Sequence, residues 1–179
     1  MNIGWERKIG YSFVGLMAGN GVNLILLLLI ALLTKLDVFA QIQQFWNLDI
    51  RTALLLFMVF GMFSMLGWAV VGLPVMLALR TEVAADFHWI TSALVGAALG
   101  ILAMLLLFTA LYQGRIDQIV HPSNPQEIRT FAGFFSDAAL IAAVTFAVYC
   151  SQVKAALLRR SKENGAPSGT PRSLAWFNF

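Results

Sequence analysis

Asp137 is the only acidic or basic residue inside the four long apolar stretches of this chain. A carboxylate within a bilayer costs several kcal/mol and by default marks a site that couples to an ion or a proton. Asp137 lies six residues after Phe131, where the last stretch begins, or about 9 Å along a helix axis. The alternative is a helix that starts late and leaves Asp137 among the lipid headgroups.

The polar residues considered in the interior of the apolar stretches are Asn20, Asn23, Ser64, Ser92, Thr109 and Thr145. Asn23 and Ser64 fall near the expected middle of the membrane, and Thr109 lies nearer one surface. These three are the candidate hydrogen-bond partners of Asp137, because a carboxyl group in the membrane is expected to face other polar groups in the protein interior.

Enzymatic chemistry has few residues to draw on. The two histidines, His88 and His121, lie in loops that the expected topology places on opposite sides of the membrane, so they cannot act together in one subunit. Cys150 is the only cysteine, which excludes an intrachain disulfide and a thiol-pair oxidoreductase. Asp37 and Asp49 are isolated loop carboxylates rather than a magnesium site. The sequence therefore predicts a protein that is not an enzyme and has no cofactor and no bound metal.

Small residues recur at four-residue spacing in two of the stretches, and this spacing places each set on one helix face. The two sets are Gly15, Gly19 and Asn23, and Ser92, Gly96 and Gly100. Small faces allow close approach of helix backbones, which is how helices associate in lipid. Each face is expected either to pack within this chain or to bind another membrane protein or a second copy.

Four stretches of nearly membrane-spanning length must position these residues: 12–33, 53–79, 89–112 and 131–153. About 20 apolar residues in a helix cross a bilayer. Hydrophobic residues make up 59% of the chain and charged residues 12%, against roughly 25% charged in a soluble domain. The sequence predicts an all-α integral membrane protein. We expect a four-helix transmembrane bundle over residues 1–160, followed by a flexible basic tail, 161–179, with an aromatic end.

The connections carry weaker signals. Apolar residues at helical spacing within 35–51 indicate either a short helix in the membrane surface or an irregular loop with aromatic anchors. Pro74 is expected to kink the second helix. The segment 80–88 reads as a short turn between antiparallel helices, and 113–129, with Pro122 and Pro125, reads as an ordered turn.

Charge sets the expected orientation, because lysine and arginine favour the cytoplasmic side. With both termini cytoplasmic, the inner segments contain eight Lys or Arg residues and the outer loops contain four. We therefore expect a multi-pass protein of a cell membrane, with a bacterial inner membrane as the expected location. The first apolar run is longer than a signal-peptide core and is interpreted as an uncleaved helix. The basic residues are interpreted as topology signals that also contact lipid headgroups, not as a nucleic-acid site.

Two function classes fit these observations. The first is a non-enzymatic membrane protein that binds another integral membrane protein. It would be an accessory or assembly subunit of a membrane complex such as a secretion or respiratory machine, or an immunity or inhibitor protein against a membrane-targeted toxin. The alternative is a small homo-oligomeric transporter or channel component with Asp137 as its coupling group.

Overall fold

The computed structural model describes residues 3–35, 50–111 and 125–163, and every regular element in these ranges is helical. The elements are α1 (Trp5–Lys35), α3 (Ile50–Gly67), the π-helix η1 (Trp68–Gly72), α4 (Leu73–Ala78), α5 (Thr81–Asp86), α6 (Trp89–Leu111) and α8 (Pro125–Glu163). Four segments are long and apolar enough to cross a membrane: Trp5–Ile30, Phe57–Ala78, Trp89–Leu111 and Phe131–Ser161. The prediction of an all-helical, multi-pass membrane protein is confirmed.

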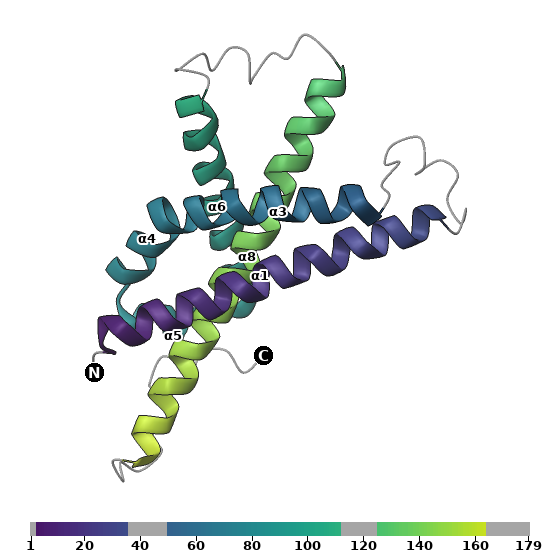
Figure 1. The fold of residues 1–179 in the computed structure, drawn as a ribbon. Helices are drawn as coiled ribbons and strands as arrows, with labels where there is room; N and C mark the ends of the chain where they lie inside the picture. Colours follow the sequence, from purple (N-terminus) through teal and green to yellow (C-terminus); the bar gives the residue numbers. More distant parts are fainter. Residues whose placement is uncertain (1–2, 36–49, 112–124, 164–179) are drawn as a thin grey trace.

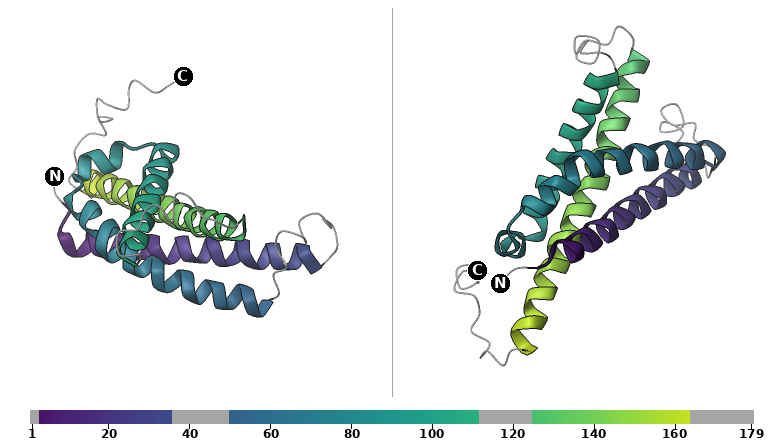
Figure 2. Two further views of the ribbon diagram at one scale, coloured as in Figure 1. Left: turned by 90° about the horizontal axis from the view of Figure 1, so that it is seen from above. Right: turned by 60° about the vertical axis from the view of Figure 1, so that its left-hand side comes forward.

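The helices form two pairs that diverge from a common region (Figure 1). α1 runs beside α3, and α6 runs beside α8. α8 is the shared element, because it packs extensively against both α6 and α1. Figure 2 shows the same divergence from a second side: the far ends of the two pairs point in different directions. Most of the close packing between helices therefore surrounds the middle of α8.

The first and last spanning helices are longer than their apolar stretches. α1 begins at Trp5 and ends at Lys35, and α8 runs from Pro125 to Glu163. The prediction of a turn that extends to residue 129 is wrong over 125–129, since these residues are helical. Pro125 is well suited to a first helical position, where its missing N–H has no partner to lose. The predicted surface helix or loop within 36–49, and the tail from 164 onward, lie outside the described residues.

The second spanning helix is interrupted where Pro74 was expected to kink it. The π-helix η1 occupies Trp68–Gly72, and the backbone N–H of Leu73 donates to the carbonyl oxygen of Trp68. Proline has no N–H and its ring clashes with the carbonyl four residues earlier, so a wider local winding relieves the clash. Figure 1 shows the change of direction between α3 and α4 at this point.

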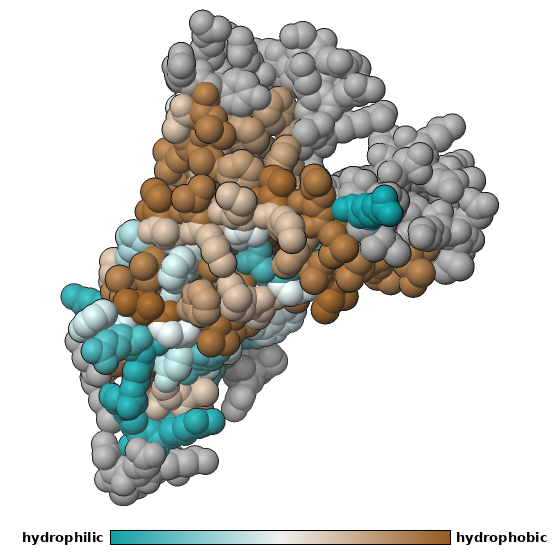
Figure 3. Space-filling model, in the orientation of Figure 1, coloured by the Kyte–Doolittle hydropathy of each residue, from teal (hydrophilic) through white to brown (hydrophobic). Residues whose placement is uncertain are grey.

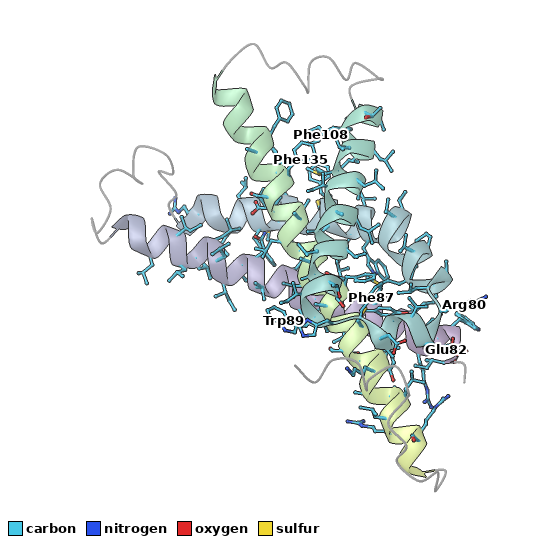
Figure 4. All side chains as sticks on the ribbon, turned by 180° about the vertical axis from the view of Figure 1, so that it is seen from behind. Arg80, Glu82, Phe87, Trp89, Phe108 and Phe135 are labelled. Carbon is cyan, nitrogen blue, oxygen red and sulfur yellow. The ribbon has the colours of Figure 1, made fainter. Side chains whose placement is uncertain are left out.

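The segment 80–88 is more than the short turn predicted. It contains α5, a helix of six residues whose Thr81 and Ala84 are buried. α5 packs against α8, and Phe87, which follows it, lies with its ring centroid 6.2 Å from that of Phe146 (Figure 4). Two buried side chains three residues apart were too weak a pattern to be recognised as a helix. This element closes one end of the core around Tyr149.

Charged side chains gather at one end of the molecule. The start of α1, α5 and the last part of α8 lie toward this end, and Figure 3 shows that most of the hydrophilic surface gathers here, whereas the other visible helices are mostly hydrophobic. Arg7, Arg80, Lys154, Arg159 and Arg160 belong to these segments. The described beginning and end of the chain therefore lie at the same polar end.

Candidate functional site

The glycine face of α1 lies against the backbone of α8. A Cβ placed on Gly15 would lie 2.5 Å from the carbonyl oxygen of Thr145, and one placed on Gly19 would lie 2.5 Å from that of Ile141. Only glycine permits this approach, because a real Cβ cannot come so close to a backbone oxygen. The face is therefore occupied within the chain.

The small face of α6 also lies against α8. Ser92, Gly96 and Gly100 are buried. A Cβ on Gly96 would overlap the carbonyl oxygen of Ala142, and one on Gly100 would overlap that of Ala138. These faces were expected either to pack within the chain or to bind another protein. In the structure both faces pack within the chain, against α8. Neither is free to receive another protein.

Beyond the glycines, aromatic side chains fill the space between α6 and α8. The ring centroid of Phe108 lies 5.3 Å from that of Phe131 and 5.9 Å from that of Phe135, as Figure 4 shows for the last pair. Phe134 contacts Phe108 and also Phe60 on α3, at 5.9 and 5.2 Å. These ring contacts keep the far half of this helix pair in contact.

Two of the predicted intramembrane polar residues bind one another. The hydroxyl group of Ser64 on α3 lies 2.9 Å from Oδ1 of Asn20 on α1 and donates to it. The Asn20 amide Nδ2 in turn donates to the carbonyl oxygen of Leu16. This hydrogen bond joins α1 and α3, and it accounts for both polar groups without Asp137.

Asp137 is buried, with 8% of its surface exposed, and Asn23 is completely buried. α8 begins at Pro125, twelve residues before Asp137, so the helix does not start late. None of the expected partners is hydrogen-bonded to Asp137: Ser64 binds Asn20, and Thr109 donates to the carbonyl oxygen of Leu105. Both amide atoms of Asn23 lack a hydrogen-bond partner among the described residues.

Sequence reasoning missed a polar contact at the charged end. Lys8, expected as a free topology charge, is buried, and its Nζ donates to the carbonyl oxygens of Leu77 and Leu79 at 3.1 and 2.7 Å. The Tyr149 hydroxyl donates to the carbonyl oxygen of Met76. Together they satisfy carbonyls at the end of α4, which otherwise have no partner in the helix. In the sequence, the only indication of such a cap was that Pro74 lies close to the end of this helix.

An apolar cleft of about 80 Å³ opens between α3–η1 and the α6–α8 pair. Its lining includes Phe60, Trp68 and Leu99, and its polar members are few, among them Ser64 and Thr145. These side chains can hold an apolar group, but they do not bring together a nucleophile and a base. Within the described ranges, no group of three or more His, Cys, Asp or Glu residues could hold a metal ion.

The outer face of α3 is the least covered surface among the spans. In an 18-residue window within Phe57–Ala78 only 6% of residues are buried, against 22–33% in the equivalent windows of the other three spans. Met58, Met62 and Met65 follow one face at helical spacing, and the first two are 72% and 70% exposed. Three of the seven methionines of the chain therefore lie on one uncovered face.

Comparison of this chain with family models, with curated proteins and with solved structures finds no match. The class of protein therefore follows from the fold: a multi-pass, all-helical membrane protein built around one central helix. Any function must be argued from its surfaces and from its buried polar groups.

Proposed function

We propose that this protein is a non-enzymatic protein of a bacterial inner membrane that acts by binding a helix of another integral membrane protein through the outer face of α3. In this role it is an accessory or assembly subunit of a larger membrane complex, or an inhibitor of a membrane-targeted protein. The small-residue faces that first suggested a partner are occupied by α8, so the docking surface is assigned to α3.

The methionine row on α3 is the observation that carries this proposal. Methionine is unbranched and polarisable, so it adapts to irregular partner surfaces, and it is common at binding faces that must accommodate another helix. α3 also makes few contacts with α6 and α8 compared with those between α6 and α8. α3 packs mainly against α1, so its opposite side, which carries the adaptable methionine side chains, is open to a partner.

A photo-crosslinking amino acid at Met62 tests the docking face. We expect ultraviolet light to produce one adduct of defined mass with a single foreign membrane protein, and the same adduct at Met58. The matched control is Leu94, which is exposed on the outer face of α6. Equal labelling at Met62 and Leu94, or no protein adduct at Met62, would show that this face contacts lipid.

The orientation with both termini cytoplasmic is part of the same proposal. Lys8 is engaged inside the protein, but discounting it still leaves seven inner lysine and arginine residues against four outer ones. In a cysteine-free background (Cys150→Ser), single cysteines at Ser123 and Ser168 are treated with an impermeant thiol reagent in intact cells. We expect Ser123→Cys to react and Ser168→Cys to react only after lysis. The opposite pattern would contradict the orientation.

A second candidate function is a small homo-oligomeric transporter or channel component with Asp137 as its coupling group. The observation in its favour is that Asp137 is buried inside a spanning helix and makes no hydrogen bond among the described residues. Purification in mild detergent separates the two candidates. A stoichiometric foreign partner supports the first, and a homo-oligomer that moves a solute in liposomes supports the second.

A further inference from the structure

Asn23 is the most completely buried polar side chain of the described spans that lacks any partner. Its exposed fraction is 0%, and neither its Oδ1 nor its Nδ2 makes a hydrogen bond within the described ranges. Buried amide groups almost always have partners, so such an exception calls for a physical explanation. The explanation must lie in what Asn23 faces.

The packing register of α1 against α8, continued by one turn beyond the two glycine contacts, brings Asn23 to the level of Asp137. Gly15 meets Thr145, and Gly19, four residues later, meets Ile141, four residues earlier. The two helices are therefore antiparallel, and facing positions recur about once per turn. The next facing positions in this register are 23 and 137. Leu27, one turn beyond Asn23, is still buried, so α1 remains covered at this depth.

Among the residues whose side chains the structure describes, none forms an ion pair with the Asp137 carboxylate. α6 contains no ionisable residue. The nearest ionisable residues on α1 are Tyr11 and Lys35, each twelve residues, or about 18 Å, along the helix from Asn23. On α8 they lie farther along the axis than a hydrogen bond can reach: Arg129 is eight residues, or about 12 Å, before Asp137, and Tyr149 is twelve residues after it. Arg51, near the start of α3, is exposed and lies thirteen residues before Ser64, the residue that meets Asn20.

Apart from Lys35 at the end of α1 and Glu127 and Arg129 at the start of α8, the remaining charged groups of the elements that pack on α8 lie at the polar end of the molecule. They are Glu6, Arg7 and Lys8 on α1, Glu82 and Asp86 on α5, and Lys154, Arg159, Arg160, Lys162 and Glu163 on α8. None can balance a charge at the middle of the α1–α8 interface.

We propose that Asp137 and Asn23 form a binding site for one small monovalent cation, Na⁺ or a proton, between α1 and α8. A buried charge persists only when it is paired, and one positive charge makes this site neutral, whereas a divalent ion would leave a net charge in the span. Both cations also satisfy the Oδ1 of Asn23, and its Nδ2 can donate to the second oxygen of the Asp137 carboxyl group. This Oδ1 is a hard oxygen ligand for Na⁺ beside the carboxylate, or it accepts the hydrogen bond of a protonated Asp137.

This site deepens the second candidate function and does not require transport. If Asp137 responds to cations but the protein moves no solute, the cation site stands and the transport function is ruled out. Conversely, if Asp137→Asn still transports the solute, the transport function stands and this site is ruled out as its coupling group.

The wild-type protein can be tested with dicyclohexylcarbodiimide, an apolar reagent that modifies protonated carboxyl groups within membranes. Labelling of Asp137 in detergent, located by peptide mass spectrometry, is expected to increase as the pH falls. If the cation is Na⁺, NaCl should slow labelling at constant pH and choline chloride should not. If the cation is a proton, the two salts should act alike. Absence of labelling, or labelling that responds to neither pH nor Na⁺, would overturn the site.

Substitutions then identify the ligands. In wild type, the melting temperature should rise with Na⁺ or fall as the pH is raised, because ligands that bind the folded state stabilise it. Asp137→Asn, which retains the shape without the charge, should abolish that response, and Asn23→Leu should weaken it several-fold. Thr109→Val, which removes an intramembrane hydroxyl bound within α6, should respond like wild type. A full response in either Asp137→Asn or Asn23→Leu would contradict the proposal.

Discussion

Replacing Gly100 with leucine is expected to disrupt the α6–α8 pair and to cause a large loss of stability. A Cβ at this position would lie 2.7 Å from the Cβ of Ala142 and would overlap the backbone oxygen of Ala138. Backbone atoms cannot rotate away, so the helices must separate along their whole contact. Overpacking typically costs about 1–3 kcal/mol, and a clash with backbone falls at the upper end.

Gly96 should behave in the same way. A Cβ there would lie 2.8 Å from the Cβ of Phe146 and 2.9 Å from the Cα of Ala143. We expect Gly96→Leu and Gly100→Leu to lower the melting temperature in detergent by many degrees. The alanine substitutions at the two sites should produce smaller losses of the same sign.

Gly61 provides the matched control for the alanine series. It lies within α3, and a Cβ placed on it would meet nothing within 4 Å. Alanine is a better helix former than glycine by about 1 kcal/mol in soluble helices, so Gly61→Ala should leave the melting temperature unchanged or raise it. If Gly100→Ala and Gly61→Ala shift the melting temperature equally, the close approach of α6 to α8 is not formed.

The spans could be predicted from the sequence because their cause is local. An apolar stretch of sufficient length must be helical in lipid, since its backbone polar groups have no other partner. The ends of the helices could not be predicted in the same way. α1 and α8 extend through charged residues such as Arg7 and Arg159, which hydropathy treats as boundaries but which a helix accommodates at its polar ends.

The sequence singles out polar residues within the spans, but it does not show which of them meet. Asn20 and Ser64 bind one another because α1 and α3 run side by side, and no sequence pattern shows which residues meet across two helices. The register of α1 against α8 likewise depends on where Gly15 and Gly19 meet Thr145 and Ile141. Spacing within one helix defines a face, whereas its partner depends on the tertiary arrangement.

Methionines were not singled out in the sequence for a related reason. In the apolar stretch 53–79, Met58, Met62 and Met65 are equally consistent with a buried and with an exposed face. Only the position of α3 at the edge of the α1–α8 contact leaves them uncovered. The docking face of the proposed function therefore depends on the structure.

Replacing Lys8 with methionine is expected to loosen the charged end of the protein. Methionine retains the apolar stem, but it removes the two hydrogen bonds from Nζ to the carbonyl oxygens of Leu77 and Leu79. Hydrogen bonds to a charged group contribute about 1.5–3 kcal/mol, and carbonyls left buried without a donor add a penalty. We expect a lower melting temperature and faster proteolysis near the end of α4.

Arg7 provides the control that separates the cap from the topology charge. It is adjacent to Lys8, carries the same charge and is exposed. Arg7→Met removes the same contribution to the positive-inside asymmetry without removing a hydrogen bond to α4, so its melting temperature should stay near that of wild type. Tyr149→Phe, which removes only the bond to the Met76 carbonyl oxygen, should fall between the two. Equal effects of Lys8→Met and Arg7→Met would mean that Lys8 acts through its charge at the membrane surface. The end of α4 would then be held mainly by the apolar cluster around Tyr149, Cys150 and Val153.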